Sequence, residues 1–379
     1  MRAAGPLGPI GLTMREPDMR RLIGLMIALV AVPAGMAGAS PPAIGAQPVA
    51  TGLEFPAAFT FAADGRIFYG ERFTGEIREY DPSSGSDQLF YRVTKLETSG
   101  ERGLLGIALH PNYPFTPFVY AYATRNVQGA IRNQIVRITD RRDGTAPGCC
   151  GRAIFSSDTV SGSYHDGGRI LFGQDGMLYA IVGEAHEPAN AQKLDNAAGK
   201  IHRMTDAGAP APGNPFPGST IFAYGIRNSY GFTFDPLNGR LWETENGPAC
   251  NDEVNLVRSG RNYAWGPSQT CSTPPPAPQN TNQDGPNPQL PETWFTPTIA
   301  PTGDAFCVGC GLSGSEGALF FGAWNTGQIR RAVLSGDRKD IASLSVVYDH
   351  GDGILSMERG PDQALYFSEP DGIYRLVDA

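Results

Sequence analysis

The strongest constraint on the fold is a turn followed by a short strand, which recurs along the chain. Asp-Gly or Asn-Gly precedes an apolar strand ending in an aromatic residue in 64–68, 175–179 and 238–242. Weaker copies occupy 111–120, 316–320 and 362–366. The closing aromatics lie at 68, 120, 179, 242, 320 and 366, roughly 60 residues apart on average. Asp-Gly and Asn-Gly favour tight turns with positive φ, so each copy predicts a turn leading into a buried strand.

A second strand is expected shortly after each of these. Its copies occupy 75–78, 133–137, 199–203, 253–257, 327–330 and 372–375. Apolar and charged residues alternate in them, which predicts one buried and one solvated face. The chain of 379 residues has 48 Gly and 32 Pro and shows no long helical pattern. We therefore predict an all-β, six-bladed β-propeller whose termini share a blade, in preference to a β-sandwich or an open array.

The N-terminal segment has the pattern of a signal peptide. Arg20 and Arg21 precede an apolar run at 22–32, and the small residues at 37–39 fit a cleavage site. We predict a signal peptide over 1–39, with Met19 as an alternative start, and export to the periplasm or the extracellular space. The apolar run is too short for a stable membrane span. Residues 45–379 are expected to form one propeller domain with a long surface loop at 267–301.

Charge and cysteine content restrict the partners and the compartment. The formal net charge of −8 argues against nucleic acid as a partner. The six cysteines favour disulfides in an oxidising compartment, although their pairing is open. The Cys307-x-x-Cys310 motif could instead be half of a zinc site, but no second motif completes it.

Three polar segments border the repeat strands and suggest an active site at the mouth of the propeller. His165, in a segment with two glycines, could accept a proton, and Glu184 could fix its tautomer. Arg227 and Asn228 suit a developing oxyanion. The alternatives are a structural histidine and a surface salt bridge.

A third segment offers clustered oxygen donors. Residues 245–253 read Glu-Asn-Gly-Pro-Ala-Cys-Asn-Asp-Glu. Carboxylates, amides and the backbone carbonyls of Gly247 and Pro248 are ligands that suit calcium. The alternative is an acidic loop that holds no ion.

Over residues 52–376 the chain resembles the glucose/sorbosone dehydrogenase family, soluble propellers that oxidise sugars with pyrroloquinoline quinone (PQQ). The resemblance is carried by short motifs in the same order and spacing, which lie at 100–106, 165–169, 191–201, 224–228, 246–255, 262–265 and 300–303. It implies calcium- and PQQ-dependent oxidation of aldose sugars to lactones. It also implies a small-molecule sugar substrate and an external electron acceptor, with a monomer or homodimer as the assembly.

The resemblance also implies a role for each matching residue. His165 corresponds to the general base and Glu184 to its supporting carboxylate, which is aspartate in many relatives. Arg227, Asn228 and Glu101 correspond to residues beside the cofactor. The carbonyls of Gly247 and Pro248 correspond to ligands of the calcium that bridges to the cofactor. Glu253 and the Tyr263 carbonyl correspond to ligands of a second, structural calcium.

The chain departs from the family where relatives carry basic side chains that hold the cofactor carboxylates. The stretches 306–310 and 325–328 contain none, although one of Arg330 and Arg331 could turn inward. The CxxC motif is expected near the same mouth. Two other functions therefore remain open: a sugar- or ligand-binding propeller without quinone, and a metal-dependent hydrolase of the lactonase kind.

Overall fold

The computed structural model describes residues 43–379 apart from 143–146, 159–161, 269–270 and 272–282. The predicted signal peptide lies outside the described residues. In the described part, no helix is long and apolar enough to cross a membrane. Among the described residues the one helical segment is a short 3₁₀ turn, η1 (Pro188–Gln192).

In the part of the chain that the structure describes, twenty-four strands form six four-stranded antiparallel sheets. The first three are β2 (Pro56–Phe61), β3 (Ile67–Glu71), β4 (Glu76–Asp81) and β5 (Ser86–Arg92); then β6 (Leu104–Leu109), β7 (Phe118–Val127), β8 (Ala130–Asp140) and β9 (Gly148–Asp158); then β10 (Ile170–Phe172), β11 (Leu178–Val182), β12 (Lys200–Met204) and β13 (Ile221–Tyr224).

The other three complete the ring. They are β14 (Ser229–Phe234), β15 (Leu241–Glu245), β16 (Asp252–Val257) and β17 (Thr293–Phe295); then β18 (Pro301–Phe306), β19 (Leu319–Ala323), β20 (Gln328–Leu334) and β21 (Ile341–Asp349); and β22 (Ser356–Arg359), β23 (Leu365–Glu369) and β24 (Gly372–Asp378) with β1 (Ile44–Thr51). Strand β17 lies within the stretch predicted as a long loop.

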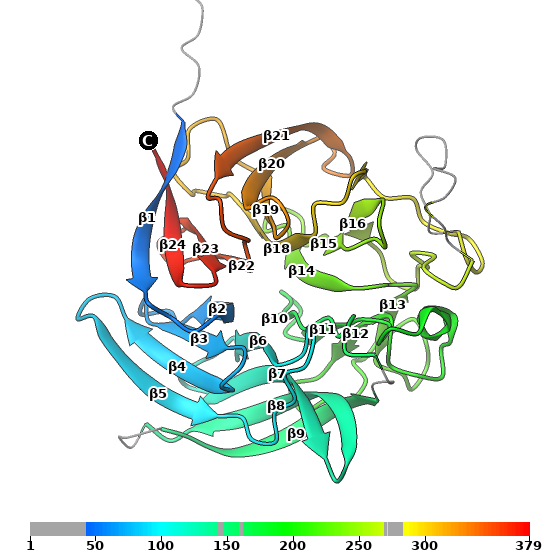
Figure 1. The fold of residues 1–379 in the computed structure, drawn as a ribbon, viewed down its shortest axis with the longest axis horizontal. Helices are drawn as coiled ribbons and strands as arrows, with labels where there is room; N and C mark the ends of the chain where they lie inside the picture. The colour runs from blue at the N-terminus through cyan, green and yellow to red at the C-terminus, as the bar shows by residue number, and fades with distance from the viewer. Residues whose placement is uncertain (1–42, 143–146, 159–161, 269–270, 272–282) are drawn as a thin grey trace, which may run out of the picture. The chain divides into compact units, whose positions relative to one another are not determined.

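The six sheets are the blades of a β-propeller, as predicted (Figure 1). The first strand of each blade, such as β2, lies nearest the centre. The last blade pairs β1 with β24, from Ile44 opposite Asp378 to Thr51 opposite Gly372. The two ends of the described chain therefore close the ring in one blade.

The predicted repeat corresponds to the two middle strands of every blade. The copies that end in an aromatic residue lie on β3, β7, β11, β15, β19 and β23. The second predicted strand of each blade is β4, β8, β12, β16, β20 or β24. Apolar residues from these strands pack between neighbouring blades. Phe68 and Ile77 of one blade, for example, share a buried cluster with Leu104 and Val119 of the next. Removing such faces from water supplies the main stabilisation of the fold.

The cysteines are partly paired. Cys250 is bonded to Cys271 and Cys307 to Cys310, so the CxxC motif is a disulfide. The CxxC motif lies between β18 and β19, at the end of β18 remote from Thr302, which lines the central cavity. Its predicted place near the mouth is wrong, because the chain has by then run along the whole innermost strand. Cys149 and Cys150 are free.

Candidate active site

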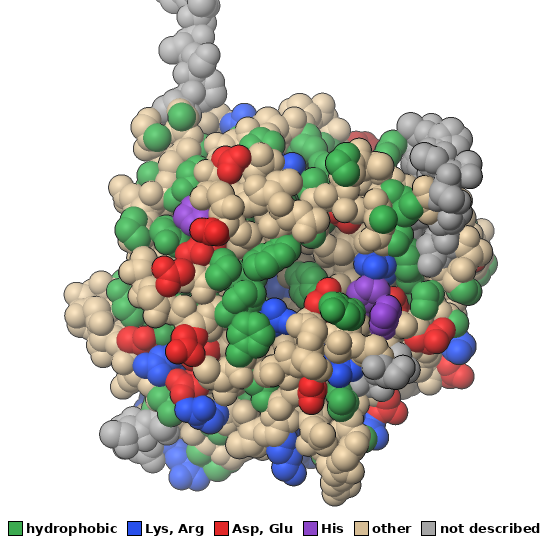
Figure 2. Space-filling model, viewed as in Figure 1, with side chains coloured by type: hydrophobic (Ala, Val, Ile, Leu, Met, Phe, Trp, Pro, Cys, Tyr) green, Lys and Arg blue, Asp and Glu red, His purple; other side chains and the backbone are tan. Residues whose placement is uncertain are grey.

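A cavity of about 470 Å³ opens at one end of the propeller axis. All six connections that lead from one blade to the next contribute to its wall. From these and nearby segments come Phe55, Ala57, Arg72, Gly100, Glu101, Leu105, Tyr164, His165, Arg227, Asn228, Tyr230, Asn246, Gly247, Pro248, Asp252, Thr298, Ala300, Thr302, Trp324, Asn325 and Leu355. Figure 2 shows this hollow near the centre of the visible face, with hydrophobic side chains beside it.

His165 lies in the cavity wall and is held by a buried carboxylate. Its Nδ1 is 2.5 Å from Oε1 of Glu184, which follows β11 and is 1% exposed. An ionised Glu184 accepts a hydrogen bond, so the proton of a neutral imidazole resides on Nδ1 and leaves Nε2 as an acceptor. The structure therefore brings the predicted pair together, with Nε2 of His165 as the ring nitrogen that can accept a proton.

The two glycines after His165 make this placement possible. Gly167 and Gly168 have φ values of 68° and 137°. A Cβ at Gly167 would lie 2.7 Å from the Ile181 carbonyl oxygen, and one at Gly168 would lie 2.5 Å from Leu105 Cβ. The loop thus packs directly on two neighbouring strands, which only glycine permits. Gly183 is equally restricted, because its Cβ would meet the His165 carbonyl oxygen.

Glu101 and Asn228 form a second hydrogen-bonded group beside His165. Oε2 of Glu101 accepts the His165 backbone N–H at 2.8 Å and the Asn228 amide at 3.0 Å. The same amide lies 3.1 Å from the hydroxyl of Tyr230, whose pKa is raised well above its usual value by burial. Tyr230 therefore stays protonated as a neutral donor. Three connections between blades are joined at this point.

Arg227 supplies a positive charge to the cavity. Its Nη1 donates to the Asn246 carbonyl at 2.8 Å, and its guanidinium lies 5.1 Å from the centre of the Trp265 ring. Burial lowers its pKa from the usual value, although an arginine remains cationic at neutral pH. Its carbonyl accepts the Glu184 N–H, so the segments carrying base and cation are tied together.

Gly247 and Pro248 lie in the cavity wall in a turn fixed by Asp252. Oδ1 of Asp252 accepts the Gly247 N–H at 2.8 Å. Its Oδ2 accepts the N–H groups of Ile299 and Ala300 at 2.6 and 2.7 Å. One buried carboxylate therefore joins the turn after β15 to the segment that leads into β18.

Below this turn lies a group of buried acids on β15 and β16. Glu245 pairs opposite Glu253, and Glu243 opposite Asn255, in the strand register. One oxygen of each glutamate, and Oδ1 of Asn255, has no hydrogen-bond partner among the described residues. Burial raises the pKa of Glu243 to about 7 and those of Glu245 and Glu253 well above their usual value. Such crowded carboxylates suit a bound cation.

Tyr263, the other predicted ligand of a structural calcium, is buried in the segment after β16. Its hydroxyl donates to the Leu256 carbonyl at 2.8 Å, and its N–H donates to the Tyr224 carbonyl. The role of its carbonyl as a partner of Glu253 stays a prediction.

One part of the cavity wall carries no basic side chain. Trp324, Asn325 and Leu355 line it. Neither Arg330 nor Arg331 is among the lining residues: the guanidinium of Arg330 lies 5.6 Å from the Phe295 ring, and Arg331 donates to the Gly314 carbonyl. The prediction that one of these arginines could turn inward is wrong, because β20 is the third strand of its blade and lies away from the axis.

Comparisons with known proteins decide the family. The model of the family described as Glucose / Sorbosone dehydrogenase matches residues 53–376. The chain belongs to the glucose/sorbosone dehydrogenase family. It is an oxidoreductase of the sugar dehydrogenase type, and the family resemblance is confirmed over residues 53–376.

Individual relatives agree with this assignment. The aldose sugar dehydrogenase YliI of Escherichia coli is 26% identical, over 86% of this chain and 90% of its own. The crystal structure of a glucose dehydrogenase-like oxidoreductase of Thermus thermophilus matches with a TM-score of 0.76 and 32% identity, over 88% of this chain and all of that chain. The PQQ-bound aldose sugar dehydrogenase of Streptomyces coelicolor matches with a TM-score of 0.75 and 29% identity, over 89% of this chain and 99% of its own.

Sequence reasoning missed several residues of the cavity. Arg72, Tyr230 and Trp324 line it, and none was assigned a role from the sequence. Asn246 and Asp252 also line it; the sequence offered them as oxygen donors for calcium, and in the structure Asp252 accepts three backbone N–H groups. Arg72 and Trp324 follow the second strand of their blades, as Glu184 does, and this shared position is the signal that could have found them.

Proposed function

We propose that this family member oxidises the anomeric carbon of an aldose to a lactone, with a PQQ-class quinone and calcium in the axial cavity. The observation that carries the proposal is the His165–Glu184 pair in the same cavity as Arg227 and Asn228. Removal of a hydroxyl proton requires a nitrogen that can accept it. Growth of negative charge on an electron acceptor requires a nearby cation and a hydrogen-bond donor, which Arg227 and the Asn228 amide supply.

The residues present fit the polar end of such a cofactor. Arg227 and Asn228 would contact its quinone oxygens, and the Gly247 and Pro248 carbonyls would hold calcium beside it. When bound, the quinone supplies the two-electron acceptor for the sugar hydride. At the other end of the cavity, the lining residues Asn325 and Leu355 are uncharged. The arginines among the lining residues are Arg72 and Arg227, so we expect the cofactor to bind more weakly than it would beside several basic side chains that hold its carboxylates.

The chain's own residues would handle the proton. Nε2 of His165 takes the hydroxyl proton, and the resulting imidazolium is stabilised by Glu184 through Nδ1–H. Glu101 and Asn228 hold the His165 backbone and keep the ring at the wall. The buried acids Glu243, Glu245 and Glu253 would hold a second cation with a structural role.

The test is a titration of purified protein with PQQ and excess calcium, followed by dye reduction with glucose. We expect saturable activity, and we expect His165→Ala to lower kcat by about 100-fold or more at unchanged melting temperature. His110→Ala is the matched control, because His110 follows β6 at the end remote from Glu101. Absence of quinone binding at micromolar PQQ would favour a sugar-binding propeller without quinone. The uncharged wall at Asn325 and Leu355 is the observation that supports this alternative.

The cellular location of the enzyme, its electron acceptor and its assembly are part of the same proposal. Two disulfides, with the signal-peptide pattern at 1–39, support export to the periplasm or the extracellular space. The substrate would be a small sugar, and an external acceptor would reoxidise the cofactor in a monomer or homodimer.

A further inference from the structure

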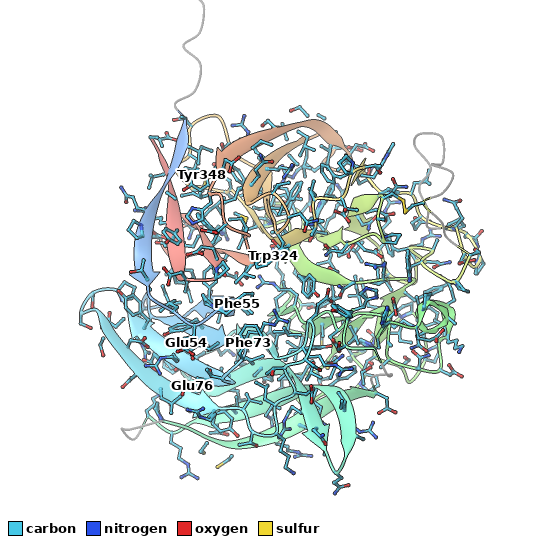
Figure 3. All side chains as sticks on the ribbon, in the orientation of Figure 1. Glu54, Phe55, Phe73, Glu76, Trp324 and Tyr348 are labelled. Atoms are coloured by element: carbon cyan, nitrogen blue, oxygen red, sulfur yellow. A yellow bond between two sulfur atoms is a disulfide. The ribbon has the colours of Figure 1, made fainter. Side chains whose placement is uncertain are left out.

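Three aromatic side chains form a row from the cavity wall outward. Figure 3 shows Phe55 between Trp324 and Phe73. The Phe55 ring centre lies 5.1 Å from that of Phe73 and 5.9 Å from that of Trp324. Trp324 is 41% and Phe73 49% exposed, whereas Phe55 is half-buried. Exposed aromatic rings that contact one another beside a cavity, unlike exposed apolar residues scattered singly, indicate a binding role.

The three rings pack against backbone and against the Arg72 guanidinium on one side. A Cβ at Gly353 would lie 2.3 Å from the Trp324 ring, so the indole rests directly on the backbone there. The Arg72 guanidinium lies 5.2 and 4.7 Å from the ring centres of Phe55 and Phe73, and its Nε donates to the Arg102 carbonyl at 3.0 Å. Rings fixed in this way can offer their open faces to a ligand at little cost in conformational entropy.

The position of the row identifies the ligand chemistry. Phe55 and Trp324 line the cavity, whereas Phe73 lies just beyond the lining residues. A sugar has an apolar C–H face that packs on an aromatic ring and hydroxyl edges that bond to polar neighbours. Arg72 and Asn325 offer donors beside the rings. Any further sugar units attached to the aldose that reacts at His165 must leave the cavity through its mouth, where the row begins.

We propose that Phe55, Phe73 and Trp324 form a stacking subsite for the second and third units of a neutral oligosaccharide whose reducing end enters the cavity. The subsite rests on the proposed sugar oxidation and specifies its preferred substrate. Glucose occupies the inner position alone and does not reach Phe73. A trisaccharide spans the row and gains affinity from each ring.

The experiment compares kcat/KM for glucose, maltotriose and cellotriose in the PQQ- and calcium-loaded protein. Phe73→Ala is expected to lower the value for the preferred trisaccharide roughly 3- to 10-fold, through KM, and to leave glucose unchanged. Phe73→Leu, which keeps apolar surface but loses the ring, should resemble Phe73→Ala. Phe115→Ala is the matched control: Phe115 is 94% exposed in the β6–β7 connection, and no substrate should respond to it.

Two outcomes would overturn the subsite: equal effects of Phe73→Ala on glucose and both trisaccharides, or no effect on any of them. Quenching of tryptophan fluorescence by each trisaccharide, measured without cofactor, separates this proposal from the proposed function. Quenching that Phe73→Ala weakens, in a protein that oxidises no sugar with PQQ and calcium, would retain the subsite and overturn the proposed function. Glucose oxidation with no trisaccharide preference would do the reverse.

Discussion

At the scale of single residues, the active site depends on side chains whose orientation is fixed by the backbone around them. His165 has a φ of 65° and is followed by two glycines that pack on neighbouring strands. The sequence predicted the pairing of His165 with Glu184, because each lies at the end of a recognisable motif. It could not predict that Arg330 and Arg331 lie away from the cavity, since alternation along a strand does not say how far that strand is from the axis.

Glu184 is a positioning residue, and its role can be tested separately from that of His165. Glu184→Gln removes the charge that stabilises the imidazolium and permits the wrong tautomer, so kcat should fall about 100-fold or more with little change in KM. Glu184→Asp keeps the charge and should recover a large part of kcat. Steady-state kinetics with the loaded enzyme provide the measurement. Equal kcat in the Gln and Asp variants would contradict an electrostatic role.

At the scale of elements, the sequence predicted the middle strands of the blades and missed most of the others. Strands β3 and β4 carry turn signals and alternation, which the local pattern reveals. The innermost strand β10 has three residues, and the outermost β21 is exposed or half-buried along its length, so neither has a clear apolar period. Their pairing is set by the ring and not by local sequence.

The β15–β16 pair gives a prediction about metal removal. Glu245 is buried opposite Glu253, and Glu243 is buried on the same strand as Glu245; each has one unpaired oxygen among the described residues, and a calcium ion would neutralise them. Chelation should therefore lower the melting temperature, by about 5 °C for calcium at a hundred times its Kd. Scanning calorimetry with and without calcium checks this. Glu253→Gln should remove most of the calcium response, while Glu54→Gln, an exposed acid, should leave it intact. An identical response in both variants would rule out a cation at this strand pair.

At the scale of the whole molecule, six blades deliver their connecting loops to one cavity, so the site exists only when the ring is complete. The number of blades was predictable from the spacing of the repeats. The composition of the cavity wall was less so, because residues as distant in sequence as Phe55 and Leu355 meet there. Only closure of the ring brings them together.

Closure by β1 can be tested by truncation. A chain beginning at Gly52 lacks β1 and leaves β24 without its partner, so we expect a large fall in melting temperature and a tendency to associate through the open edge. A chain beginning at Ala43 keeps β1 and serves as the control. Thermal unfolding and light scattering report the two effects. Equal melting temperatures for both chains would show that β1 does not stabilise the ring.

The same pairing sets an order of events in biogenesis. Strand β1 is among the first parts of the domain to be synthesised, yet its partner β24 is the last strand of the propeller to be made. During synthesis β1 therefore has no strand partner until residues 372–378 have been made. The last blade can form only after the strands of the other five have been synthesised, so closure of the ring comes late in folding.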